Sequence, residues 1–166
     1  MARAKRIRKK IVQPDPLLGN RVVTKFINRL MRDGKKSVAS KVFYRSLEVI
    51  KEKTGQDGLE VMLQAIQTIG PRMEVRARRV GGASYQVPMD VRGDRREALA
   101  IRWIIQAAQK RNPKEFVGQS KQTPIMSYKL ASELIDCTKG IGEAIKKRDA
   151  THRMAEANRA FAHFRW

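Results

Sequence analysis

The sequence has few of the residues on which metal, redox and membrane functions depend. Cys137 is the one cysteine in 166 residues, which excludes an intrachain disulfide and a zinc site built on cysteines. The two histidines, His152 and His163, are too few for a zinc site of their own. No apolar run reaches the roughly 18 residues that a membrane helix needs, and the basic N-terminus lacks the apolar stretch of a secretory signal. We therefore expect a protein of a reducing compartment without metal, cofactor or membrane segment.

Acidic residues are also scarce. The chain has 16 Asp+Glu against 36 Lys+Arg, which gives a net charge of +20 and an isoelectric point near 10.9. Such an excess predicts a polyanionic partner, with nucleic acid as the first candidate and an anionic membrane as the second. Hydrophobic residues make up 42% of the chain, too many for a disordered basic tail, so a packed domain is expected.

The spacing of apolar residues predicts a mainly α-helical domain of six helices, with a β-hairpin between the third and the fourth. A basic arm at 1–12 precedes the domain at 13–158, and a basic and aromatic tail follows at 159–166. Ser37, Asp94 and Thr123 are candidate N-caps. The expected helices span about 22–31, 38–53, 59–69, 95–108, 125–135 and 143–158.

The hairpin is expected at 73–92, where the apolar period changes from 3.6 to 2. Two alternating runs flank the glycine pair Gly81-Gly82, and Pro88 restricts its strand to an edge because it cannot donate a ladder hydrogen bond. A two-stranded ribbon is marginal alone, so we expect a projecting arm held by packing or by a ligand.

Positive charge gathers in five places: the arm, the turn after the first helix, the hairpin, the start of the fourth helix, and the last helix with the tail. One such cluster would be an ordinary solvated surface, but five together predict nucleic-acid binding through many phosphates. Arginines dominate the hairpin, and the planar guanidinium can hold a phosphate by two hydrogen bonds or stack on a base.

The tail has two interpretations. Phe161, Phe164 and Trp166 could stack on bases while Arg159 and Arg165 contact phosphates. Alternatively, the two phenylalanines pack onto the domain as a C-terminal latch.

An enzyme is not expected. Neither histidine stands in a recognisable catalytic motif, and His152 is more simply a surface or capping residue. Cys137 is most simply a small buried hydrophobe. Gly140-Ile141-Gly142 does not continue into a dinucleotide-binding fingerprint, so no small-molecule substrate is indicated.

Three contiguous stretches resemble a known family. They include Asp33-Gly34-Lys35-Lys36, Arg78-Arg79-Val80-Gly81-Gly82 and His152-Arg153-Met154-Ala155-Glu156-Ala157-Asn158. From about residue 10 to the end, the chain is similar to small-subunit ribosomal protein seven of the bacterial and organellar type. The segment 112–124 is longer than the bacterial pattern, and 139–143 is slightly extended.

The resemblance implies six helices with a β-hairpin between the third and the fourth. It implies binding to the 3′ major domain of small-subunit rRNA, nucleation of the subunit head, and a position at the subunit interface near the exit-site tRNA and the mRNA path. By position, the rRNA-binding residues would be Arg3, Lys5, Arg6, Arg8, Lys9, Lys10, Lys35, Lys36, Arg76, Arg92, Arg95, Arg96 and Arg102. Those near tRNA and mRNA would be Arg78, Arg79, Val80, Gly81, Gly82, His152, Arg153 and Asn158.

The resemblance further implies ribosomal proteins nine, eleven, thirteen and nineteen as neighbours, on a bacterial-type cytoplasmic ribosome or an organellar one. Some bacterial members also repress translation of their own operon. The alternative is a basic helical DNA-binding protein of architectural or regulatory function. A helix-turn-helix reader would concentrate its contacts on one short helix, whereas charge spread over five places favours folded RNA.

Overall fold

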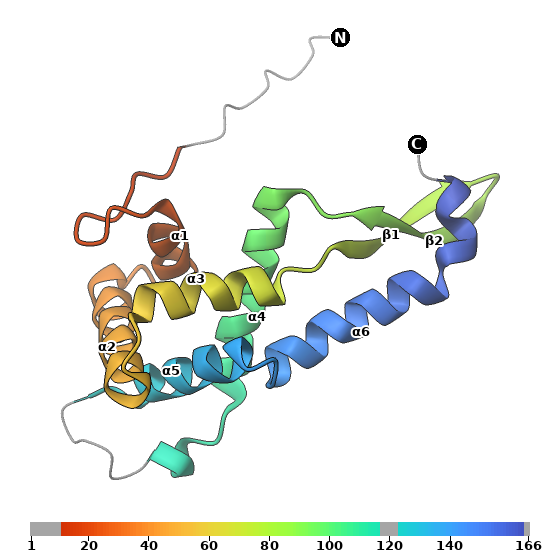
Figure 1. The fold of residues 1–166 in the computed structure, drawn as a ribbon. Helices are drawn as coiled ribbons and strands as arrows, with labels where there is room; N and C mark the ends of the chain where they lie inside the picture. The colour runs from red at the N-terminus through yellow and green to blue at the C-terminus, as the bar shows by residue number, and fades with distance from the viewer. Residues whose placement is uncertain (1–10, 117–122, 165–166) are drawn as a thin grey trace, which may run out of the picture.

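The computed structural model describes residues 11–116 and 123–164, and it shows a helical body from which a hairpin and one helix project to the same side (Figure 1). The described residues confirm the predicted class, with six α-helices and a two-stranded antiparallel hairpin between α3 and α4. The elements are α1 (Arg21–Leu30), α2 (Lys36–Thr54), α3 (Gly58–Ile69), β1 (Met73–Val80), β2 (Ala83–Asp90), α4 (Gly93–Lys110), the 3-10 helix η1 (Pro113–Phe116), α5 (Ile125–Thr138), α6 (Glu143–Ala157) and the 3-10 helix η2 (Arg159–Phe164).

The core lies where α5 packs against α2, α3 and α4. Phe26 of α1 meets Phe43 of α2 with ring centroids 5.3 Å apart, and both side chains are fully buried. Leu130 and Leu134 on α5 are also fully buried, and Cys137 one turn further on has no exposed surface, as expected of a small core residue. Burial of side chains of this size stabilises the fold by roughly 1.5–3 kcal/mol each.

Three of the helices have N-cap residues other than those expected. Their N-cap residues are Lys35, Arg92 and Pro124, and none of these makes a side-chain capping hydrogen bond. Ser37 and Asp94 therefore lie inside the first turn of α2 and α4, and Thr123 lies outside α5, so the predicted caps were wrong. These helices therefore depend on the packing of their apolar faces rather than on a side-chain cap for stability at their first turn.

The hairpin pairs Met73 with Asp90 at its base and Val80 with Ala83 at its tip. Gly81 and Gly82 have φ of +57° and +89°, and a two-residue turn that follows the twist of the strands requires positive φ at both central residues. β1 packs against α6, and β2 packs against η2 (Figure 1). Of the two expected supports for the ribbon, packing or a ligand, the structure shows packing.

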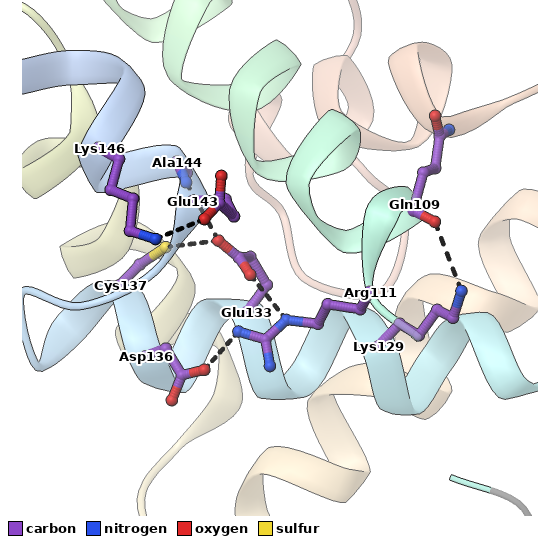
Figure 2. A network of polar contacts seen from close by, with 9 residues as sticks. All are labelled: Gln109, Arg111, Lys129, Glu133, Asp136, Cys137, Glu143, Ala144 and Lys146. Carbon is purple, nitrogen blue, oxygen red and sulfur yellow. Dashed lines mark hydrogen bonds and ion pairs between the residues drawn. The ribbon is translucent and has the colours of Figure 1, made fainter. Parts of the chain in front are cut away.

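A buried acid joins α5 to α6 (Figure 2). Glu133 is 1% exposed; it accepts a hydrogen bond of 2.7 Å from Arg111 Nε and one of 3.3 Å from the backbone N–H of Ala144, in the first turn of α6. Arg111 also forms an ion pair with Asp136. Gly142 has φ +115°, which L side chains rarely adopt, and an added Cβ would stand a tight 3.0 Å from Glu133 Oε1, so glycine suits this close approach to the carboxylate. The carboxylate thereby fixes where α6 starts.

The segment expected as a long loop at 112–124 contains η1, whose Phe116 is buried and stacks nearly parallel on Tyr128 at 6.5 Å. Residues 117–122 of that loop lie outside the described residues. None of the described helices is both long and apolar enough to cross a membrane.

Candidate nucleic-acid interface

A cleft between α1 and α4 gathers cations from both helices. Arg21, Lys25 and Arg29 of α1 face Arg102 of α4 across a space of about 580 Å³, which Ile11, at the end of the basic arm, also lines. Sequence reasoning predicted Arg102 but missed the three residues of α1. These three residues are spaced four apart, which places them on one side of the helix opposite the apolar face. That spacing would have predicted a basic helix face.

The cleft is only partly neutralised from within. Lys25 Nζ lies 2.9 Å from Glu97 Oε1, and Asp94 also lines the space. Within the described part of the chain, Arg21 and Arg102 form no ion pair, so their charges remain available to an anion. The cleft is therefore a basic surface with one internal counter-ion pair.

Glu74 on β1 holds two of the predicted arginines side by side. Arg95 Nε donates to both of its oxygens, at 2.7 and 2.8 Å, and Arg76 Nε donates to Oε1 at 2.7 Å. Burial raises the pKa of Glu74, but the hydrogen bonds and charges of Arg95 and Arg76 outweigh it and hold the pKa below its usual value. About half of each arginine side chain is exposed, so the pair forms a fixed cationic surface between the hairpin and α4.

Arg96 differs from its neighbours because its guanidinium is engaged inside the protein. Its Nε donates to the carbonyl of Gly70 at 2.9 Å, and its NH2 group donates to that of Gln67 at 3.3 Å. The side chain therefore ties the start of α4 to the end of α3. By contrast, Lys35, Lys36 and Arg92 are exposed at the starts of α2 and α4.

A second group of predicted residues lies on the projecting side. Gly81, Gly82 and Arg79 are exposed at the hairpin tip, with Val80 half-buried, while Arg78 lies along the ribbon with its NH2 group 3.9 Å from Met89 Sδ. An added Cβ at either glycine would meet nothing within 4 Å, so the glycines serve the turn and leave open space around it.

His152 connects α6 to the base of the hairpin. Its Nε2 accepts the backbone N–H of Arg72 at 3.0 Å; because Arg72 lies between α3 and β1, the bond ties α6 to the start of the hairpin rather than capping a helix. Burial and then the charge of Arg148 lower the pKa of His152, and the neutral acceptor is thereby favoured. Arg153 is exposed on the same helix, and Asn158 caps its end by donating to the carbonyl of Met154 at 2.8 Å.

The tail packs against the hairpin. The ring of Tyr85 on β2 lies 5.3 Å from that of Phe161 and 5.0 Å from that of Phe164. The latch interpretation is thus the one the structure favours, with the difference that the rings contact the ribbon rather than the helical body. Arg165 and Trp166 lie outside the described residues, as do Arg3, Lys5, Arg6, Arg8, Lys9 and Lys10 of the arm.

The segment that follows the basic arm is held on α2 through Asp15. Tyr44 Oη donates to Asp15 at 2.8 Å, and Asp15 also accepts the backbone N–H of Leu18 at 3.1 Å. Burial, followed by the hydrogen bond to Asp15, raises the pKa of Tyr44 to about 12. This contact holds the segment after the arm on α2. Among the described residues, no group of three or more His, Cys, Asp or Glu is placed to hold a metal ion.

A helical body with basic surfaces on a cleft and on a projecting ribbon places the chain in the class of basic helical proteins suited to a polyanionic partner. A family model for ribosomal protein S7p/S5e matches residues 2–159, and the chain belongs to that family. Relatives described as small ribosomal subunit protein uS7 are 51% identical in Brachyspira hyodysenteriae, 52% in Carboxydothermus hydrogenoformans and 48% in Thermus thermophilus, each over 166 residues and the full length of both chains. The protein is therefore a structural component of the small ribosomal subunit, and the predicted resemblance is confirmed.

Proposed function

We propose that the chain binds the 3′ major domain of small-subunit rRNA and nucleates the folding of the subunit head. The α1–α4 cleft, together with the Arg76–Glu74–Arg95 group, would contact the rRNA backbone. The observation that carries this proposal is the fixed pair of half-exposed arginines on Glu74, because a preorganised cation loses little freedom when it meets a phosphate.

The projecting side has a second function in this proposal. The hairpin tip and α6, with Arg79 and Arg153 exposed, lie near the exit-site tRNA and the mRNA path at the subunit interface. Ribosomal proteins nine, eleven, thirteen and nineteen are the proposed neighbours, on a cytoplasmic ribosome of bacterial type. Family membership argues against the DNA-binding alternative.

A matched pair of variants tests the rRNA contact. One variant, called the hairpin variant, replaces Arg76, Arg92 and Arg95, on and beside the hairpin, with Gln; the control replaces the exposed α2 residues Lys41, Arg45 and Lys51 with Gln, so both lose three positive charges. We expect the hairpin variant to bind a transcript of the 3′ major domain more weakly, with a log K against log salt slope about 2 units flatter. The control should keep nearly the slope of the unmodified protein.

Two outcomes would contradict the proposal. An equal change in both variants would show that only total charge matters, and an unchanged slope in the hairpin variant would show that its arginines do not contact phosphate.

A further inference from the structure

An apolar groove opens where the end of α1, the start of α2, the end of α4 and the start of α5 meet. It encloses about 420 Å³, within the range of roughly 300–1,000 Å³ of small-ligand sites. Leu30 and Val42, each 8% exposed, and Met126 form its apolar wall. Val38 lies at its mouth with 56% of its surface exposed. This is a concave apolar surface beside the turn that joins α1 to α2.

The groove carries positive charge. Arg32 and Lys35 line it and are exposed, and neither forms an ion pair within the described part of the chain. No Asp or Glu stands among the described residues that line it, although Asp33 lies in the same turn. Apolar and cationic groups together match a ligand that has a flat apolar part and an anionic part.

Gln109, at the end of α4, adds a hydrogen-bonding group to the lining. Its backbone carbonyl accepts from Lys129 Nζ at 3.4 Å, and its carboxamide lies on the side away from that lysine (Figure 2). A carboxamide both donates and accepts, which suits the edge of a nucleobase.

We propose that this groove binds one unpaired nucleotide of an RNA strand. The base packs on Val38 and Met126, Gln109 contacts its edge, and Arg32 and Lys35 hold the adjoining phosphate. Unpaired bases are the part of RNA that protein pockets recognise, and the thioether of Met126 makes favourable contacts with an aromatic ring. This inference rests on the proposed rRNA binding and adds to it a site outside the cleft and the hairpin.

The inference is tested on the full chain by photo-cross-linking. The probes are two single-stranded 12-mers, an oligouridylate with a central 4-thiouridine and an oligoadenylate with a central 8-azidoadenosine, and cross-linked residues are identified by mass spectrometry. We expect cross-links at Val38, Gln109 or Met126 from at least one probe.

Two glutamate variants distinguish binding in the groove from a general effect of the protein's net charge. Val38→Glu places a carboxylate at the groove mouth, while Ile141→Glu, at a position 64% exposed, makes the same charge change outside it. We expect Val38→Glu to reduce the groove cross-links about fivefold or more and Ile141→Glu to leave them nearly unchanged. Circular dichroism of both variants checks that they are folded.

The remaining outcomes overturn the inference. If a transcript of the 3′ major domain binds but neither probe cross-links in the groove, this site is wrong while the proposed function stands. If Val38→Glu keeps all RNA cross-links but fails to retain a neighbouring protein in reconstituted subunits, the groove takes an acidic, apolar peptide instead. If the transcript does not bind at all, the proposed function itself fails.

Discussion

At the scale of single residues, Glu133 links the end of α4 to the start of α6 through two hydrogen bonds. A carboxylate that is 1% exposed would be costly without partners, and here Arg111 supplies the charge while the start of α6 supplies an N–H. The Cys137 thiol lies 3.7 Å from Glu133 Oε1. Burial and this nearby carboxylate raise the pKa of the thiol. The thiol is therefore protonated and inert at neutral pH.

Removing the arginine from this pair should be strongly destabilising. Arg111→Met leaves Glu133 buried without its cation, and we expect the free energy of unfolding to fall by about 3–5 kcal/mol. The control is Arg45→Met, which breaks the exposed pair with Glu48 and should cost about 0–1 kcal/mol. Urea denaturation measures both, and similar losses in the two variants would show that burial of Glu133 does not matter.

Mild acid should loosen α6 from the hairpin base. Burial and the charges of Arg148, Arg72 and Arg96 lower the folded-state pKa of His152 despite Asp149, so its contribution to stability is present above about pH 6.5 and is lost as the pH falls. Protonation removes the acceptor for the Arg72 N–H. We expect the free energy of unfolding to fall less between pH 7 and pH 5 in His152→Gln, which keeps an acceptor and does not titrate. An identical pH dependence in both proteins would contradict this.

The local sequence pattern predicted the role of some of these residues and not of others. The sequence predicted that His152 is a surface or capping residue rather than a catalyst, whereas its actual partner, the N–H of Arg72 before the hairpin, is brought near only by the fold. The pairing of Glu133 with Arg111 likewise could not be predicted, because no local pattern indicates which distant cation forms an ion pair with a buried acid. Arg96 was assigned to rRNA by its place in the basic cluster and in the family pattern, and neither distinguishes a solvent-facing guanidinium from one that binds backbone carbonyls.

At the scale of elements, the hairpin is stable because two other segments lie along it. α6 packs against β1 and η2 packs against β2, which gives the ribbon the additional contacts that two strands lack by themselves. The ring of Tyr85 is the main point of contact with η2. The tail is thus part of the structure that presents the hairpin.

Loss of the Tyr85 ring should release the tail. In Tyr85→Ala, we expect faster amide hydrogen exchange in η2 and β2, with α2 and α5 unchanged, because stability differs between parts of a fold. Tyr85→Phe keeps the ring and should restore the slow exchange. Uniformly faster exchange throughout the chain would instead indicate that the ring supports the whole domain.

The order of the elements was predictable because each helix repeats its apolar positions over several turns and the hairpin changes that period to 2. The two 3-10 helices were not predicted, since four to six residues carry no period. The tail was left with two interpretations because stacking on a base and packing on Tyr85 require the same aromatic residues. Only the fold brings Phe161 and Phe164 to the hairpin.

At the scale of the whole molecule, the net charge of +20 opposes the compact state of the free protein. We expect the melting temperature to rise by several degrees between 20 and 300 mM sodium chloride, since the Debye length shortens to under 10 Å and about 1 kcal/mol corresponds to 2–4 °C in a chain of this size. Differential scanning calorimetry of the isolated protein measures it. A flat response would mean that internal pairs such as Lys25–Glu97 already balance the repulsion.

The hairpin leaves and rejoins the body at a single point, where the N–H of Val91 donates to the carbonyl of Arg72 at 2.9 Å. The length of the hairpin can therefore change without altering the path from α3 to α4, although the contacts of β1 with α6 and of β2 with η2 would move with it. Deleting two residues from each strand would draw the tip back by about 7 Å and keep every remaining side chain on its own face, whereas deleting one would reverse the faces. The reach of the hairpin is thus set in discrete steps of the strand repeat, which insertion or deletion can change without moving α3 or α4.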